Sequence, residues 1–125
     1  MIVVAATLAA GALGAVTRFV VDSAVRQRWS TRFPWATLAI NVSGSLLLGL
    51  LAGGVLFAQH PAEWQTILGT GFCGGYTTFS TASLETVRLI QQRCHRHAAV
   101  NLAGSLLASV AACASGLAVM WVAAT

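Results

Sequence analysis

The sequence predicts an all-α integral membrane protein with four transmembrane helices, from its composition and from four long apolar segments. Hydrophobic residues make up 57% of the 125 residues and charged residues only 8%, whereas soluble domains carry about 25% charged residues. So little charge cannot cover a surface that faces water. A nucleic-acid-binding domain needs clustered basic faces on a polar surface, so the composition also excludes nucleic acid as a partner and leaves membrane lipid as the surroundings.

The four apolar segments form a single membrane domain over residues 1–125. Crossing a bilayer core of about 30 Å takes about 20 helical residues. The segments that meet this length are residues 2–21, 35–57, 64–90 and 98–123. A soluble helical bundle would need a polar face on each helix, and the first two segments have almost none.

The arginines predict how the chain is oriented in the membrane. Arg26, Arg28 and Arg32 lie in the first connection and Arg93 and Arg96 in the third, while the second connection and both termini have none. Cytoplasmic loops carry an excess of arginine and lysine. We therefore expect the first and third connections in the cytoplasm and both termini outside.

Small residues recur four apart, which lets helices approach closely in lipid. Ser45, Gly49 and Gly53 follow this spacing in the second segment, and Ala10 and Gly14 follow it in the first. Packing within the chain and packing against another subunit both fit this pattern.

Polar side chains at membrane depth usually face a protein interior or a water-filled path. Asn41 lies four residues before Ser45 in the second segment. Asn101, Ser105 and Ser109 share one face of the fourth segment. This ladder fits either a polar track for a solute or helix packing.

The stretch "GFCGGYTTFSTAS", residues 71–83, favours a break in the third transmembrane helix over glycines that serve helix packing alone. Each glycine lowers helix stability by about 1 kcal/mol relative to alanine, and with Gly69 just before this stretch four glycines lie within seven residues. A break at membrane depth frees carbonyls that can hold a cation. Phe79 follows it, and the positive edge of an aromatic ring can face an anion.

Together these residues resemble the Fluc (CrcB-like) family of fluoride channels. The resemblance covers nearly the whole chain, through "GALGAVTR", "PWATLAINVSGSLLLG", "GFCGGYTTFSTASLE" and "NLAGSL". It implies an antiparallel dimer of four-helix subunits in the bacterial plasma (inner) membrane. The dimer would have two narrow pores and export fluoride passively, which lowers its toxicity.

The resemblance also assigns residues. Asn41 matches the family's pore asparagine, Phe79 the first of two pore phenylalanines, and Ser105 and Ser109 a hydroxyl track. Thr37 is counted with this fluoride pore. The backbone carbonyls of Gly74 and Thr77 match positions around a structural sodium ion (Na⁺) at the dimer interface. Arg18 and Glu85 fall at other characteristic positions, and His97 and Asn101 at one end of the track. The second pore phenylalanine is replaced by Ala82.

Two alternatives remain at this stage. The first is a small four-span proton-coupled multidrug exporter, which needs an acid in its first span. The one acid near that span is Asp22, close to its end. Asp22 lies four residues from Arg18 and could pair with it. The chain is not predicted to be an enzyme.

The second alternative concerns the partner subunit. A homodimer whose copies insert in both orientations calls for similar numbers of arginines on the two sides of the membrane. The arginines here lie on one side, so a heterodimer with a homologous chain stays open.

Overall fold

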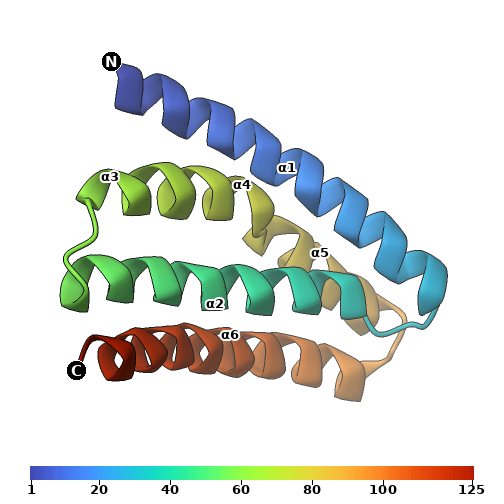
Figure 1. The fold of residues 1–125 in the computed structure, drawn as a ribbon. Coiled ribbons are helices and arrows are strands. Elements are labelled where there is room, and N and C mark those ends of the chain that lie inside the picture. Colours follow the sequence, from blue (N-terminus) through green and yellow to red (C-terminus); the bar gives the residue numbers. More distant parts are fainter.

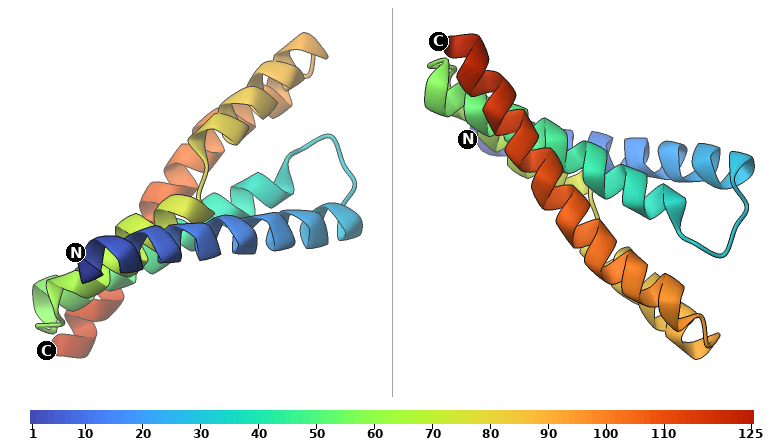
Figure 2. Two further views of the ribbon diagram at one scale, coloured as in Figure 1. Left: turned by 90° about the horizontal axis from the view of Figure 1, so that it is seen from above. Right: turned by 90° about the horizontal axis from the view of Figure 1, so that it is seen from below.

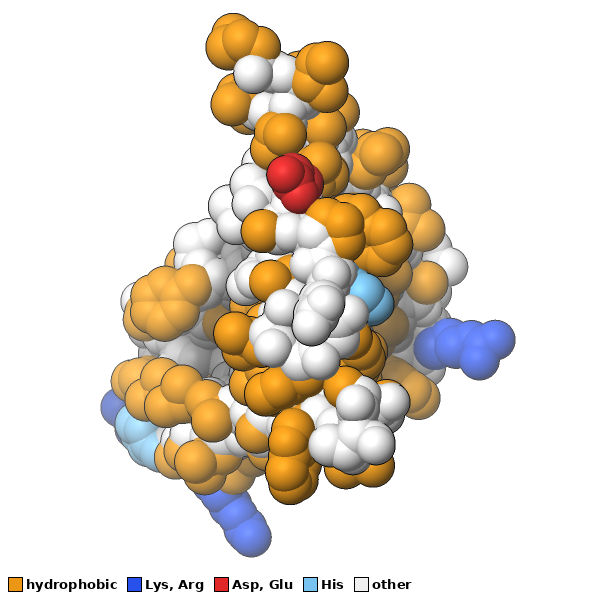
Figure 3. All heavy atoms as spheres, turned by 60° about the vertical axis from the view of Figure 1, so that its left-hand side comes forward, with side chains coloured by type: hydrophobic (Ala, Val, Ile, Leu, Met, Phe, Trp, Pro, Cys, Tyr) orange, Lys and Arg blue, Asp and Glu red, His pale blue; other side chains and the backbone are white.

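Three long helices form the frame of the computed structural model, which describes residues 1–125. They are α1 (Ile2–Arg28), α2 (Trp35–Phe57) and α6 (His95–Ala124). All three are long and apolar enough to cross a membrane. Large apolar side chains are exposed along each of them, and Figure 3 shows apolar atoms spread over the visible face with few charged groups. Surfaces of this kind suit lipid rather than water, so the chain is a multi-pass helical membrane protein.

The remaining apolar segment is divided into several shorter elements. They are α3 (Ala62–Trp64), the π-helical turns of η1 (Gln65–Cys73), α4 (Gly74–Tyr76) and α5 (Phe79–Gln91). Between α4 and α5 the backbone is extended, with φ −80° and ψ 159° at Thr77 and φ −149° and ψ 121° at Thr78. The Thr78 hydroxyl accepts a hydrogen bond from the Thr81 amide at 3.2 Å and so caps the start of α5.

The elements diverge from one another at this extended pair of residues. α2 and α6 run side by side, and α1 lies against η1 and α4 (Figure 1). The two views in Figure 2 show α5 leaving with the first half of α6, away from α1 and the first half of α2. The helices are therefore gathered at one end of the molecule and forked at the other.

Glycines allow the gathered helices to touch backbone to backbone. A Cβ atom on Gly14 would overlap the Phe72 carbonyl, and one on Gly49 would overlap the Cys113 carbonyl. One on Gly53 would come within 2.6 Å of the Met120 Cβ atom. Of the two roles open to the small-residue faces, packing within the chain is the one these three glycines serve.

Both chain termini lie at the gathered end, together with the connection between α2 and α3 (Figure 1). The connections between α1 and α2 and between α5 and α6 lie at the opposite end. These two connections hold the loop arginines, so the charge asymmetry of the sequence becomes an asymmetry between the two ends of the molecule.

Candidate functional site

A cavity of about 510 Å³ lies where the helices fork. Its walls come from α2, from η1 and α4, from the extended pair Thr77–Thr78, from α5 and from α6. No charged side chain lines it. The polar groups that face it are hydroxyls, one side-chain amide and backbone groups, so the cavity can offer hydrogen-bond donors without a fixed charge.

Seven residues were assigned to the fluoride pore and the sodium site from the family resemblance, and six of them line this one cavity. Asn41 comes from α2, Phe79 from the start of α5, and Ser105 and Ser109 from α6; Gly74 and Thr77 lie beside the interruption. Thr37 does not line it. Thr37 lies four residues before Asn41 on α2 and is buried against Glu85.

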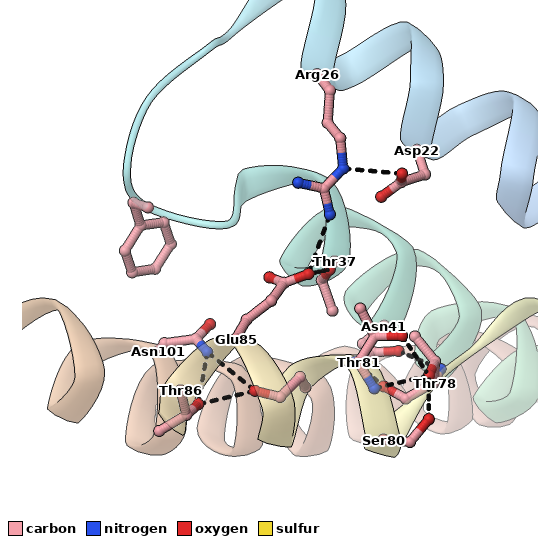
Figure 4. Close-up of polar contacts among 12 residues, drawn as sticks. Asp22, Arg26, Thr37, Asn41, Thr78, Ser80, Thr81, Glu85, Thr86 and Asn101 are labelled. Atoms are coloured by element: carbon pink, nitrogen blue, oxygen red, sulfur yellow. Dashed lines mark hydrogen bonds and ion pairs between the residues drawn. The ribbon is translucent and has the colours of Figure 1, made fainter. Parts of the chain in front are cut away.

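Asn41 pairs with the extended backbone through both ends of its amide. Its Nδ2 donates to the Thr78 carbonyl at 2.9 Å, and its Oδ1 accepts from the Thr78 amide at 2.8 Å (Figure 4). In a continuous helix the Thr78 amide would donate to the Gly74 carbonyl. The side chain of Asn41 therefore satisfies both backbone groups that the interruption releases at Thr78, and it frees the Gly74 carbonyl for another partner.

Phe79 is the first residue of α5, and its side chain is 85% exposed. It lies on the wall of the cavity, yet almost nothing in its own chain covers the ring. An aromatic ring left uncovered beside a polar cavity leaves its positive edge free to meet an anion.

The serines of α6 differ in their hydrogen bonding. The Ser105 hydroxyl donates to the carbonyl of Asn101 on the preceding turn. The Ser109 hydroxyl is buried and has no partner within the chain. A buried hydroxyl without a partner costs free energy, so this donor on the cavity wall is available to a water molecule or an ion.

Asn101 heads the same ladder in the sequence but does not line the cavity. Its Nδ2 donates to the Thr86 hydroxyl of α5 at 2.8 Å and to the Ala82 carbonyl at 3.4 Å. The side chain is 1% exposed. Asn101 therefore joins α6 to α5, and its part in this geometry is helix packing.

A cluster of charged and polar residues around the buried carboxylate of Glu85 lies beside the cavity, toward the forked end. Glu85 Oε1 accepts from the Thr37 hydroxyl at 2.7 Å and from Arg26 Nη2 at 3.0 Å (Figure 4). Arg26 Nε also donates to Asp22 at 2.8 Å. The second carboxylate oxygen of Glu85 is buried without a partner.

This cluster corrects one expectation from the sequence. Asp22 pairs with Arg26 rather than with Arg18, although both arginines are four residues away from it. Arg18 instead points its Nη1 at the Thr77 carbonyl, at 3.5 Å. The preference has a physical reason, because an acid placed four residues before a base is the better orientation on a helix.

A cavity without charged side chains, beside a helix interruption and between helices long and apolar enough to cross a membrane, is typical of a membrane transport protein. The family described as "CrcB-like protein, Camphor Resistance (CrcB)" matches residues 5–117. The chain belongs to this CrcB-like family, and the resemblance drawn from its motifs is confirmed.

Named relatives agree with this membership. The chain is 51% identical over 116 residues to "Fluoride-specific ion channel FluC 1" of Leifsonia xyli, an alignment that covers 93% of this chain and 85% of the relative. It is 50% identical over 113 residues to "Fluoride-specific ion channel FluC 2" of Cutibacterium acnes, with 87% and 89% covered. It is 45% identical over 115 residues to "Fluoride-specific ion channel FluC" of Nitrobacter winogradskyi, with 90% of each covered.

Proposed function

We propose that this chain is a subunit of a passive fluoride channel that drains fluoride from the cytoplasm across the bacterial plasma membrane. The observation that carries the proposal is the uncharged cavity where Asn41, Phe79, Ser105 and Ser109 meet. Relatives that share about half of the sequence over most of its length are named fluoride-specific channels.

The chemistry of the cavity suits a small, strongly hydrated anion. Several weak donors can replace the water around fluoride, and without a fixed positive charge they do not trap it. Fluoride enters cells as the neutral acid and ionises inside. The inside-negative membrane potential then drives the anion outward with about 2.3 kcal/mol per charge for each 100 mV, so no energy-coupling residue is needed.

The multidrug exporter is not favoured. That mechanism needs a carboxylate that exchanges protons with its substrate in the transport cavity. No acid lines this cavity. Asp22 is held in an ion pair with Arg26, and Glu85 bonds Thr37 and Arg26 beside the cavity.

The elements from α3 to α5 form, in our proposal, one transmembrane span broken at Thr77–Thr78. Together with α1, α2 and α6 this gives four spans. The wide exposure of Phe79, on a cavity formed by a single chain, supports a second subunit that closes the pathway. We propose an antiparallel dimer, in which the partner is either a second copy or a homologous chain.

The residues at the break fit the sodium ion expected at the dimer interface. The Gly74 carbonyl has lost the Thr78 amide as its helical donor, and nothing lies within 4 Å of where a Cβ atom of Gly74 would stand. The Thr77 carbonyl is approached by Arg18 at 3.5 Å, but a carbonyl oxygen has two lone pairs. Each subunit would supply one such pair of carbonyls. A Na⁺ ion bound between the two pairs would hold the helix breaks of the two subunits together.

Fluoride efflux from reconstituted vesicles tests the function. We expect purified protein to release fluoride from potassium fluoride-loaded vesicles when valinomycin lets potassium follow, and Phe79→Ile to slow this release by at least about tenfold, because an aliphatic side chain has no positive ring edge. Leu106→Ile, also on the cavity wall, is the matched control. Release of chloride at the same rate, or no release by a folded protein, would contradict the proposal.

The second subunit is tested by labelling and by ion exchange. A cysteine that replaces Ala62, in a chain without its own three cysteines, should react with an impermeant reagent from outside intact cells in nearly all molecules if orientation is fixed, as the arginines predict. Labelling of about half would instead identify a homodimer of oppositely inserted copies.

The Na⁺ site is tested by ion exchange. Exchange of Na⁺ for N-methylglucamine should weaken the dimer on size exclusion, and an unchanged dimer would contradict the Na⁺ site.

A further inference from the structure

A second cavity, of about 430 Å³, lies at the forked end of the molecule, apart from the uncharged one. It is formed where the segment before α2 meets the first turns of α6. The residues that shape it are Arg32, Phe33, Trp35, Arg96, His97 and Val100. The fluoride pathway proposed above makes no use of Arg32, Phe33 or Arg96.

The wall of this cavity is aromatic. The rings of Phe33 and Trp35 are 4.6 Å apart between centroids, and those of Phe33 and His97 are 6.2 Å apart. The contact between Phe33 and His97 joins the α1–α2 connection to α6. Arg32 Nη1 adds a contact of 3.4 Å to the Cys94 sulfur at the start of α6. The two sides of the cavity are thus held together by contacts between distant parts of the chain.

The wall of the cavity is mainly apolar, and the two charged residues in its lining are both arginines. Arg32 and Arg96 both line it, no carboxylate does, and neither arginine forms an ion pair. Both side chains are exposed. Two guanidinium groups without counter-ions, one from the connection before α2 and one from the first turn of α6, are suited to a shared anion, and guanidinium matches phosphate geometry well.

The position of the cavity favours a lipid over a soluble anion. Trp35 is the first residue of the apolar helix α2 and is 47% exposed, as expected of an aromatic residue at the membrane interface. Val100 of α6 also lines the cavity and is 52% exposed, so an acyl chain could run past it. Basic pockets between transmembrane helices on the arginine-rich side are suited to anionic lipid headgroups.

We propose that this cavity binds the phosphate headgroup of an anionic phospholipid. Arg32 and Arg96 hold the phosphate, the rings of Phe33 and Trp35 form the apolar wall below it, and the acyl chains continue along α6 past Val100. A bound lipid of this kind would join the α1–α2 connection to the start of α6 across the fork.

Native mass spectrometry of the protein released from vesicles of equal phosphatidylglycerol and phosphatidylcholine tests the proposal. We expect the protein to retain phosphatidylglycerol roughly 25-fold over phosphatidylcholine, since each of the two arginines near the membrane surface contributes roughly fivefold. The double variant Arg32→Gln/Arg96→Gln should lose this preference. The double variant Arg28→Gln/Arg93→Gln removes the same charge at the same end of the molecule, outside the cavity, and should keep it.

Three outcomes would overturn the proposal. The first is an equal loss of preference in both double variants, which would indicate general attraction to the arginine-rich end. The second is retained preference in Arg32→Gln/Arg96→Gln. The third is displacement of the lipid by millimolar glycerol 3-phosphate, which would indicate a site for free phosphate esters. If the double variant does not fold, the single variant Arg96→Gln, at an exposed position, should still reduce the preference about fivefold.

Discussion

Replacement of Asn41 by alanine is expected to reduce fluoride efflux by a factor of about 100 or more. The variant removes both hydrogen bonds that hold the extended backbone at Thr78. A buried backbone donor and acceptor left without partners cost about 1–3 kcal/mol each. The α4–α5 junction should then rearrange, and the Phe79 ring that follows it would leave the cavity wall. Vesicle efflux measures the effect.

The control for this prediction is Ser45→Ala, which changes a cavity residue one turn further along α2 and disturbs no bond to the interruption. We expect it to retain most of the efflux. Amide exchange at Thr78 provides a second measurement, because that amide should exchange faster with solvent in Asn41→Ala than in the unchanged protein. Efflux at the unchanged rate in Asn41→Ala would exclude this residue from the pathway.

Replacement of Gly75 by alanine is expected to prevent folding or to lower stability by about 3 kcal/mol, the upper range for inserting a methyl group into a tightly packed contact. A Cβ atom on Gly75 would overlap the carbonyl oxygen of Gly11 in α1. Since that oxygen belongs to the backbone, the whole helix α1 would have to move. The yield of monodisperse protein and its melting temperature in detergent measure the loss.

Gly104→Ala is the matched control, because its new Cβ atom would meet only the Val100 side chain, at an ordinary van der Waals distance of 3.8 Å. Alanine raises helix propensity by about 1 kcal/mol over glycine, so this variant should be as stable as the unchanged protein or more so. Equal melting temperatures for the two variants would show that the close approach of α1 and α4 is not rigid.

The helical framework was largely predictable, because apolar runs of this length have few alternatives. α2 occupies the same residues, 35–57, that hydropathy gives, and α6 begins three residues before the apolar run at Ala98, within the polar segment 95–97. Sequence patterns report on neighbours three or four residues apart. The four-residue spacing of Asn41 and Ser45 indicated a polar face on α2 for that reason, whereas the assignment of Asn41 and Phe79 to a pore rested on the family resemblance.

Contacts between residues far apart in the sequence could not be predicted from such local patterns. The pairing of Asn41 with Thr78 spans 37 residues, and that of Thr37 with Glu85 spans 48. Nothing in the local pattern specifies either. For Asp22 the sequence does carry a local signal, because the acid precedes Arg26 and follows Arg18, and the first order is the more favourable one on a helix. Asn101 does lie on the same face of α6 as Ser105 and Ser109, but its side-chain amide donates a hydrogen bond to Thr86.

The fork of the helices has a consequence for the lipid bilayer around the protein. Elements that gather at one end and diverge at the other (Figure 2) occupy unequal cross-sectional areas in the two leaflets. A single chain, or two chains side by side in the same orientation, would displace more lipid from one leaflet than from the other and would favour a curved membrane. Two inverted chains set the wide end of one beside the narrow end of the other. The displaced areas then match, and the pair fits a flat bilayer.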